Sequence, residues 1–501
     1  MKIFNSLYKV LFLITVVFLI VFAIKGSADF KYFTNTHSTK VTGPFEASNS
    51  TSRYALTESI VDTRKFDFSE DLAKFSSPDV VSYGSKFFTV FTPGVSLFGV
   101  PFYAIGKQFG LQQPFTYLST TIITLLNLLL LYKIARKLKV STYAALLSAF
   151  VFTFATNAYV YMQSFTQHPL TVFTLLLLFL NLLHKRTPLN NFIFGLVAAF
   201  SLLVDIPNAF LVFPMAIVWI GNSVDLIQIP KKLRISINTR TLFAVFGLII
   251  PLLVFGFYNK DLTGSPLKIA QFIGRNENIT NTELNRPQEE APSSSYEIDL
   301  PFDTRHSLNG FYILIASNER GIFYYSPVLL FGLLGLFIAF KNERLQKYAL
   351  IAISIIGVNL LSYSMFGDPW GGWSFGPRYL IPATALLCLF IGVALDRYKK
   401  NIFILLAFLS LSLYSVCVST LGTITTSSIP PKQEAENLIT PIPYTYIYNW
   451  NLLKANISGS YVFNSALYKN VSTLQFYYML SALSFSSILV GVILLQFSKN
   501  K

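Results

Sequence analysis

Long apolar stretches separated by short polar segments dominate the chain. A stretch of about 18 or more apolar residues with almost no charge is long enough to cross a bilayer as a helix. The first stretch, residues 7–23, is long for a signal peptide and is not followed by a small-residue cleavage site, so we predict that it stays as a membrane helix. The pattern predicts an all-α polytopic membrane protein with twelve spans, at about residues 7–24, 114–132, 142–160, 169–183, 189–204, 206–221, 241–258, 322–340, 348–365, 379–395, 402–421 and 474–497.

The charges between the spans predict how the chain is oriented. With the N-terminus in the cytoplasm, the inner segments hold 20 of the 39 lysines and arginines but only three of the 24 acidic residues. Such an excess follows the positive-inside rule, so the net charge of +15 requires no nucleic-acid partner. We therefore predict an integral plasma or inner membrane protein, with both termini in the cytoplasm and long extracytoplasmic loops at 25–113, 259–321, 366–378 and 422–473.

One further apolar segment, residues 87–106, is interrupted by Pro93, Gly94 and Pro101. A crossing here would place the later basic loops outside, so we predict a helix that lies on or dips into the outer face. Only 13% of the residues are charged, against about 25% in soluble domains. Cys388 and Cys417 fall inside predicted spans, which gives no disulfide framework. We divide the chain into a transmembrane core, residues 1–421, and a C-terminal part, residues 422–501, made of an outer loop and the last span.

The first outer loop carries the carboxylates best placed for acid–base chemistry. Glu58 and Asp62 are four residues apart on one face of a predicted short helix that also contains Arg53 and Tyr54. Paired carboxylates can activate a hydroxyl or hold a divalent metal ion, and no other cofactor is predicted. The alternative is an ordinary solvated helix face.

Other candidates stand where spans meet the outer surface. Asp79 and Lys86 precede the predicted interfacial helix and could face a lipid headgroup, unless they belong to a simple turn. His168 begins the fourth span, where a lone histidine is more often structural. Asp205 lies in the turn between spans five and six, where it could instead cap the next helix.

Two outer segments place an arginine beside aromatic residues. The first contains Arg320, Tyr324 and Tyr325, and the second contains Asp368, Trp370, Gly372 and Arg378. Arginine suits a phosphate because its planar fork donates two hydrogen bonds at once, and glycine allows close approach of the backbone. Aromatic residues alone would suit an interfacial belt, but the combined string of residues 370–378 is too specialised for one.

With these motifs the sequence resembles the polytopic GT-C glycosyltransferases, the group that includes protein O-mannosyltransferases and the lipid A aminoarabinose transferase. The likeness rests on residues 52–61 (SRYALTESIV), 93–97 (PGVSL), 168–170 (HPL), 320–327 (RGIFYYSP) and 370–380 (WGGWSFGPRYL). The resemblance implies a polyprenyl-phosphate-linked sugar donor and a lipid, glycan or protein acceptor. It also implies inversion at the anomeric carbon, with a first-loop carboxylate as base and basic residues on the lipid phosphate.

One position departs from the pattern of the resembled family. An Asp usually stands about three residues before the first-loop Arg, whereas this chain has Ser50. Either Glu46, Glu58 or Asp62 supplies the base, or the chain is an inactive scaffold that binds lipid-linked sugar. A third hypothesis, a transporter or flippase, predicts ionisable residues deep within the spans.

Overall fold

Helices form almost all of the structure, because a backbone within lipid must satisfy its own hydrogen bonds. The structure, a computed structural model, describes residues 2–34, 37, 40–222, 224–229, 232–237, 241–276, 279 and 307–498. In this part of the chain, twelve apolar helices coincide with the twelve predicted spans, and six of them are long enough to cross a membrane by length and composition. They are α1 (Lys2–Ala23), α5 (Gln112–Lys137), α6 (Thr142–Phe154), α8 (His168–Leu182), α9 (Pro188–Val204), α10 (Asn208–Gly221), α11 (Leu242–Thr263), α14 (Leu330–Phe340), α15 (Glu343–Ser364), α16 (Ile381–Tyr398), α17 (Ile402–Ile424) and α20 (Thr473–Gln496). The predicted class, an all-α polytopic membrane protein, is confirmed.

Short elements connect these helices. The short helices are η1 (Phe30–Tyr32), α2 (Ser48–Asp62), α3 (Glu70–Ser76), α4 (Gly94–Lys107), α7 (Ala158–Tyr161), η3 (Ala270–Phe272), α12 (Ser307–Ile315), α13 (Ile322–Tyr325), η5 (Pro327–Leu329), η6 (Arg378–Leu380), α18 (Lys432–Glu436), α19 (Ile447–Lys454) and η7 (Phe463–Leu467). The strands form two antiparallel hairpins, β1 (Val80–Tyr83) with β2 (Lys86–Thr89), and β3 (Val224–Ile229) with β4 (Lys232–Ile237). In the first hairpin Val80 pairs with Thr89 and Tyr83 with Lys86, which leaves a two-residue turn.

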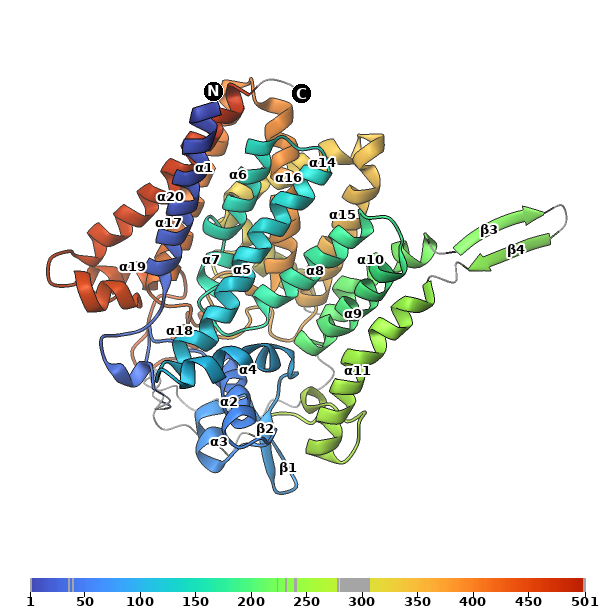
Figure 1. The fold of residues 1–501 in the computed structure, drawn as a ribbon. Helices are drawn as coiled ribbons and strands as arrows, with labels where there is room; N and C mark the ends of the chain where they lie inside the picture. The colour runs from blue at the N-terminus through green and yellow to red at the C-terminus, as the bar shows by residue number, and fades with distance from the viewer. Residues whose placement is uncertain are drawn as a thin grey trace.

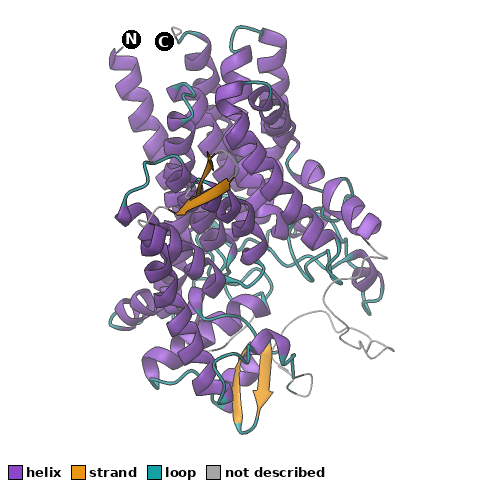
Figure 2. Ribbon diagram, turned by 90° about the vertical axis from the view of Figure 1, so that its right-hand side faces the viewer, coloured by secondary structure: helices purple, strands orange, loops and turns teal. Residues whose placement is uncertain are grey.

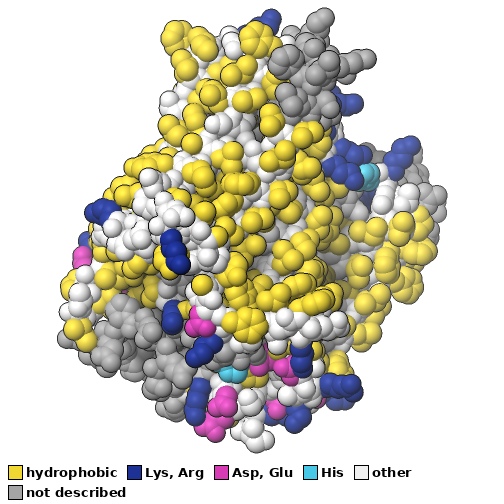
Figure 3. Space-filling model, turned by 60° about the vertical axis from the view of Figure 1, so that its left-hand side comes forward, with side chains coloured by type: hydrophobic (Ala, Val, Ile, Leu, Met, Phe, Trp, Pro, Cys, Tyr) yellow, Lys and Arg dark blue, Asp and Glu magenta, His cyan; other side chains and the backbone are white. Residues whose placement is uncertain are grey.

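The two termini lie at the same end of the helical bundle (Figure 1). At the opposite end, which we call the loop end, lie α2, α3, α4 and the β1–β2 hairpin, and Figure 2 shows the same arrangement from the side. Hydrophobic side chains cover the upper and middle parts of the face shown in Figure 3, while most acidic and many basic side chains gather at its lower end. This distribution is that of a multi-pass integral membrane protein. The assignment of the loop end to the outer side of the membrane remains a prediction from the charges.

Two hydrophobic cores hold the molecule together. The larger core fills the bundle around α16, whose residues from Ile381 to Leu395 are all buried. The smaller core joins α2, α3, the first hairpin and α4 to the adjacent end of α5. Its centre is a group of edge-to-face rings, with Phe45 packed 5.0 Å from Tyr54 and 5.2 Å from Phe75 between ring centroids. The second core therefore fixes the first outer loop on the ends of the bundle helices.

The predicted interfacial helix at residues 87–106 is confirmed only in part. The helix, α4, begins at Gly94, after Pro93, and ends at Lys107. Residues 86–89 instead form β2, because they pair with β1 across a tight turn, and this pairing is not visible in the apolar pattern of the segment. The shorter helix lies between α2 and the end of α9.

Replacing Gly94 with alanine should destabilise the loop end by about 1–3 kcal/mol, the usual effect of overpacking. A Cβ atom at Gly94 would lie 2.5 Å from the carbonyl of Leu203, just before the turn between α9 and α10. Thermal unfolding in detergent would measure the change. Gly357→Ala is the matched control, because a Cβ there meets nothing within 4 Å. Equal stability of the two variants would contradict the close packing of α4 on α9.

Candidate functional site

Four predicted site residues from separate segments lie close together at the loop end. Arg53 lies on α2, His168 begins α8, Asp205 follows α9, and Arg378 begins η6. Both guanidinium groups interact electrostatically with the Asp205 carboxylate and with the His168 ring. Arg53, His168 and Asp205 are 0%, 4% and 6% exposed, respectively, and Arg378 is partly buried. We call these four residues the buried charged cluster.

The α2 helix carries Arg53 into the protein interior. Every residue of α2 from Asn49 to Thr57 is buried, whereas Asp62 at the end of the helix is exposed, as expected for the alternative of a solvated face. The backbone carbonyl of Arg53 accepts a hydrogen bond of 2.8 Å from Ser96 Oγ, and Thr57 Oγ1 donates to the Ser96 carbonyl at 3.1 Å. These bonds join α2 to α4 and thereby set the position of Arg53.

The Arg53 guanidinium keeps donors without a partner. Its Nη1 donates to the Asn49 carbonyl at 2.9 Å, and its central carbon lies 3.8 Å from the centre of the Phe91 ring. Its Nε and Nη2 have no hydrogen-bond partner among the residues that the structure describes. Burial lowers the pKa of Arg53 to about 10, although Asp205 and Asp79 act to raise it, so the side chain stays charged at neutral pH. A buried cation with free donors favours binding of an anion.

Asp205 is a carboxylate held by neutral groups. Its Oδ2 accepts a hydrogen bond from Gln167 Nε2 at 3.2 Å, and its Oδ1 accepts one from Gln271 Nε2 at 3.4 Å. Burial raises the pKa of Asp205 above its ordinary value, while the Arg53 charge and the two amides limit that rise. A carboxylate in this environment can accept a proton, because within the described part of the chain no direct ion pair engages its oxygens.

The loop before η6 presents Arg378 to the cluster. Gly371 and Gly372 adopt left-handed conformations, with φ of 74° and 58°, and Asp368 Oδ1 accepts a hydrogen bond from the Gly371 amide at 3.0 Å. The Arg378 guanidinium lies 5.3 Å from the Tyr379 ring, and its Nε has no partner. Arg378 therefore resembles Arg53 in keeping a donor available.

Arg320 lies outside this group of available donors. It is completely buried, and it donates to the carbonyls of Trp370 at 3.0 Å, Glu319 at 2.8 Å, Gly372 at 3.2 Å and Ile429 at 2.9 Å. We predicted a phosphate-binding role, but four backbone carbonyls occupy most of its five donors. Arg320 instead fixes the loop that carries Arg378.

The two tyrosines that follow Arg320 support the same loop. Tyr325 is buried against Phe375 at 5.1 Å between ring centroids, and Tyr324 stacks on Tyr446 at 5.4 Å. These contacts do not directly support the predicted sugar-binding role of the two tyrosines. Among the described residues, the groups that act electrostatically on the two rings are Arg320 and other tyrosines, and not Arg53 or Asp205.

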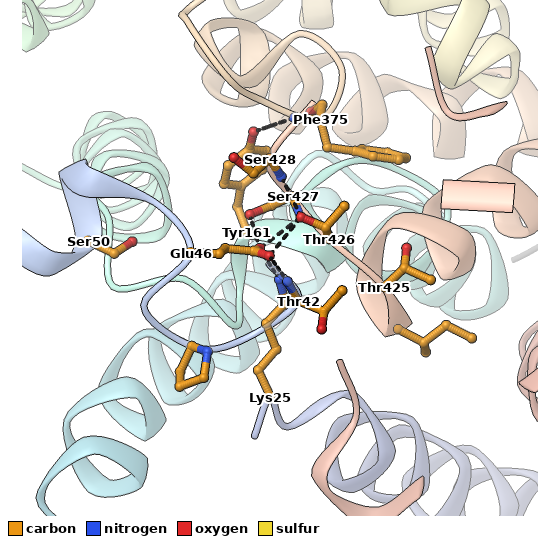
Figure 4. A network of polar contacts seen from close by, with 12 residues as sticks. Lys25, Thr42, Glu46, Ser50, Tyr161, Phe375, Thr425, Thr426, Ser427 and Ser428 are labelled. Atoms are coloured by element: carbon orange, nitrogen blue, oxygen red, sulfur yellow. Dashed lines mark hydrogen bonds and ion pairs between the residues drawn. The ribbon is translucent and has the colours of Figure 1, made fainter. Parts of the chain in front are cut away.

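Glu46 lies at the centre of a different polar network (Figure 4). Its carboxylate forms an ion pair with Lys25, and it accepts hydrogen bonds from the Thr42 amide at 3.0 Å, Thr426 Oγ1 at 2.7 Å and the Ser427 amide at 2.8 Å. Burial raises the pKa of Glu46, but Lys25 and the hydroxyl donors outweigh this effect and lower it overall. A carboxylate with all its lone pairs engaged is a poor proton acceptor, so the geometry does not support the predicted catalytic role.

Glu58 and Asp62 face away from the cluster. Because a residue turns by about 100° along an α-helix, both lie roughly opposite Arg53 on α2. Glu58 is 3.4 Å from His37 Nε2, and burial raises its pKa although His37 opposes the rise. Asp62 forms an ion pair with Lys107 at 2.8 Å and accepts a hydrogen bond from Tyr103 at 3.0 Å. The structure thus separates these two predicted bases from Arg53 and Arg378.

The remaining predicted residues have structural partners. Tyr54 lies in the smaller hydrophobic core, and Lys86 donates to the Asp261 carbonyl at 2.7 Å. Asp79 forms an ion pair with Arg275 at 2.8 Å, and it interacts electrostatically with Arg53. Within the described ranges, no group of three His, Cys, Asp or Glu side chains is arranged to hold a metal ion.

Three residues at these sites were absent from the predicted set. Gln271 and Arg275 contact the carboxylates of Asp205 and Asp79, but their segment has an ordinary polar composition that singles out neither residue. Lys25 could have been identified from the sequence, because a lysine directly after the first span is an exception to the excess of positive charge in the inner loops. Such a lysine, predicted to be outside, is a candidate for a buried ion pair.

Comparisons with known proteins give matches among solved structures only. No family model matches the sequence, and no curated protein matches it. The chain is similar to two crystal structures of ArnT from Cupriavidus metallidurans, one in the apo state and one bound to undecaprenyl phosphate. The TM-scores are 0.48 and 0.47, the sequence identities are 14% and 13%, and each match covers 97% of this chain and 77% of that chain.

Proposed function

We propose that this chain is a membrane glycosyltransferase that takes a sugar from a polyprenyl-phosphate carrier at the extracytoplasmic face. The observation that carries the proposal is the buried charged cluster: among the described residues, two arginines keep donors without a partner, and they lie near Asp205, whose partners are the amides of Gln167 and Gln271. Anion binding and proton acceptance are the two functions that transfer from a lipid phosphate requires. The motifs that resemble GT-C glycosyltransferases supply the choice of substrate class.

In this proposal Asp205 replaces the first-loop carboxylates as the general base. Its carboxylate takes the proton of the acceptor hydroxyl while the hydroxyl oxygen bonds to the anomeric carbon. The bond from that carbon to the phosphate oxygen breaks on the opposite side, which inverts the configuration. Arg53 and Arg378 stabilise the negative charge that develops on the departing lipid phosphate.

The position of the buried charges disfavours a transporter or flippase. A path through the membrane needs ionisable side chains along the spans. The described residues with buried charged side chains lie instead at the ends of the apolar helices or in the segments that connect these helices. They are Lys25, Glu46, Arg53, Asp79, Asp205, Arg320 and Lys399.

An inactive scaffold that only binds lipid-linked sugar is the second candidate, and Ser50 is the observation that favours it. Ser50 is buried in the first turn of α2, where the resembled family has an Asp. The scaffold would bind the lipid but transfer no sugar, and Ser50→Asp would create or raise activity. Full activity of the natural chain would exclude it.

Binding of undecaprenyl phosphate to the protein in nanodiscs tests the anion site. Arg53→Ala should weaken binding by roughly tenfold to a hundredfold, as expected for loss of a charge-assisted hydrogen bond worth about 1.5–3 kcal/mol, and Arg378→Ala should act in the same direction. Arg397→Ala is the matched control, because Arg397 is exposed at the opposite end of α16. If neither of the two cluster variants binds more weakly than the control, the proposed phosphate site is wrong.

A further inference from the structure

The segment of residues 264–276, which follows α11, crosses the first outer loop. Lys268 Nζ donates to Tyr83 Oη at 2.9 Å and lies 4.1 Å from the centre of the Tyr83 ring. The Asn276 amide donates to the Val80 carbonyl at 2.9 Å. The 264–276 segment is therefore attached to the β1–β2 hairpin at two places.

Two polar side chains of this segment bind the carboxylates of other segments. Gln271 donates to Asp205 at 3.4 Å, and Arg275 pairs with Asp79 at 2.8 Å. The Asp79 side chain is only 4% exposed, whereas that of Arg275 is 56% exposed. Arg275 is thus a surface cation that reaches inward to an otherwise buried anion.

Both of these carboxylates act electrostatically on Arg53, yet neither is bonded to it. Asp205 and Asp79 both favour the charged form of the guanidinium. Nevertheless, Arg53 Nε and Nη2 have no hydrogen-bond partner. Among the described residues, neither carboxylate forms an ion pair with Arg53. Opposite charges attract strongly at ion-pair distance inside a protein, so a carboxylate released from its present partner would be expected to move toward the guanidinium and pair with it.

We propose that Gln271 and Arg275 are positioning residues that hold Asp205 and Asp79 apart from Arg53. The guanidinium thereby stays available to an anionic substrate and is not neutralised by the carboxylates of the protein. Arg275 acts on Asp79, and Gln271 acts on Asp205. The identity of the anion, a lipid phosphate, rests on the proposed function, whereas the arrangement of the charges does not.

A rescue experiment distinguishes two roles of Arg275: holding Asp79 apart from Arg53, and merely attaching the 264–276 segment to the first outer loop. Arg275→Ala should weaken binding of undecaprenyl phosphate in nanodiscs by about tenfold, because the freed Asp79 pairs with Arg53. Adding Asp79→Asn to that variant should restore most of the binding, since no carboxylate is left to compete. Gln271→Ala should weaken binding too, but Asp79→Asn should not restore it. A double variant Arg275→Ala, Asp79→Asn that binds no better than Arg275→Ala overturns the proposal.

A structure of the Arg275→Ala variant by electron cryomicroscopy gives a readout that needs no ligand. The expected result is a carboxylate of Asp79 within about 4 Å of the Arg53 guanidinium, the usual limit of an ion pair. An Asp79 that keeps its distance from Arg53 overturns the inference, whatever the protein binds. Failure of the unmodified protein to bind undecaprenyl phosphate would instead contradict the proposed function, and the structure would still decide the inference.

Discussion

Replacing Asp205 with asparagine should slow sugar transfer by a factor of about 10²–10⁴, the usual contribution of a general base. Asparagine keeps the size of the side chain and can still accept a hydrogen bond from Gln167 or Gln271, but it cannot take a proton. Binding of undecaprenyl phosphate should therefore change little. The measurement is transfer in purified membranes, supplied with a panel of polyprenyl-phosphate-linked sugars.

The pH dependence of the transfer rate of the unmodified protein should reflect the ionisation of Asp205. Burial raises the pKa of Asp205 above its ordinary value, and only the ionised form can act as a base. The rate should therefore rise as the pH rises through that pKa and level off above it. This acidic limb should be absent from the residual activity of Asp205→Asn.

Glu58→Gln and Asp62→Asn are the matched controls, since both carboxylates lie on the far face of α2 and have partners of their own. Each should transfer sugar at nearly the normal rate. Full activity in Asp205→Asn combined with loss of activity in Glu58→Gln or Asp62→Asn would return the role of base to the first loop.

Much of the fold follows from local sequence. A backbone within lipid satisfies its own hydrogen bonds as a helix, so the apolar runs locate all twelve apolar helices, although only six of these helices reach the length that a full crossing needs. The β1–β2 hairpin is not predicted by this argument, because Phe87 and Phe88 belong to an apolar run that continues into α4. Pairing with β1, not local composition, decides the structure of those residues.

The two arginines of the buried charged cluster were predictable from the sequence, whereas the partners of each candidate carboxylate were not. Arg53 and Arg378 stand in unusual motifs, and both belong to the buried charged cluster. From the sequence alone, Glu46 is as good a candidate for the base as Glu58 or Asp62. Its partners Lys25 and Ser427, however, are 21 and 381 residues away in the sequence. Such contacts between distant residues determine whether a carboxylate is free or already bonded, and the local sequence around the carboxylate does not predict them.

Glu46→Ala should destabilise the protein by about 3–5 kcal/mol, the effect expected when one partner of a buried ion pair is removed. The Lys25 and Glu46 side chains are only 2% and 3% exposed, so the change would leave an uncompensated cation in the interior. The Thr42 and Ser427 amides would also lose their acceptor. Thermal unfolding in detergent would measure the loss.

The double variant Lys25→Met, Glu46→Leu distinguishes the ion pair from the rest of the network. Removing both charges eliminates the uncompensated cation, so the double variant should recover part of the stability lost in Glu46→Ala. Recovery should be incomplete, because the two backbone amides remain without an acceptor. A double variant as unstable as Glu46→Ala would show that these hydrogen bonds, and not the ion pair, account for the effect.

The acid sensitivity of the unmodified protein should follow from the same carboxylate. The pKa of Glu46 is lowered in the folded state, mainly by Lys25 acting against burial. Its ionisation therefore stabilises the fold fully above the unfolded pKa of about 4.3, and that contribution is lost as the pH falls through the lower folded value. Below about pH 4, the difference in unfolding temperature between the unmodified protein and the double variant Lys25→Met, Glu46→Leu should become smaller. A difference that stays constant with pH would mean that folding does not shift the pKa of Glu46, and the network of Figure 4 would then not favour its ionised form.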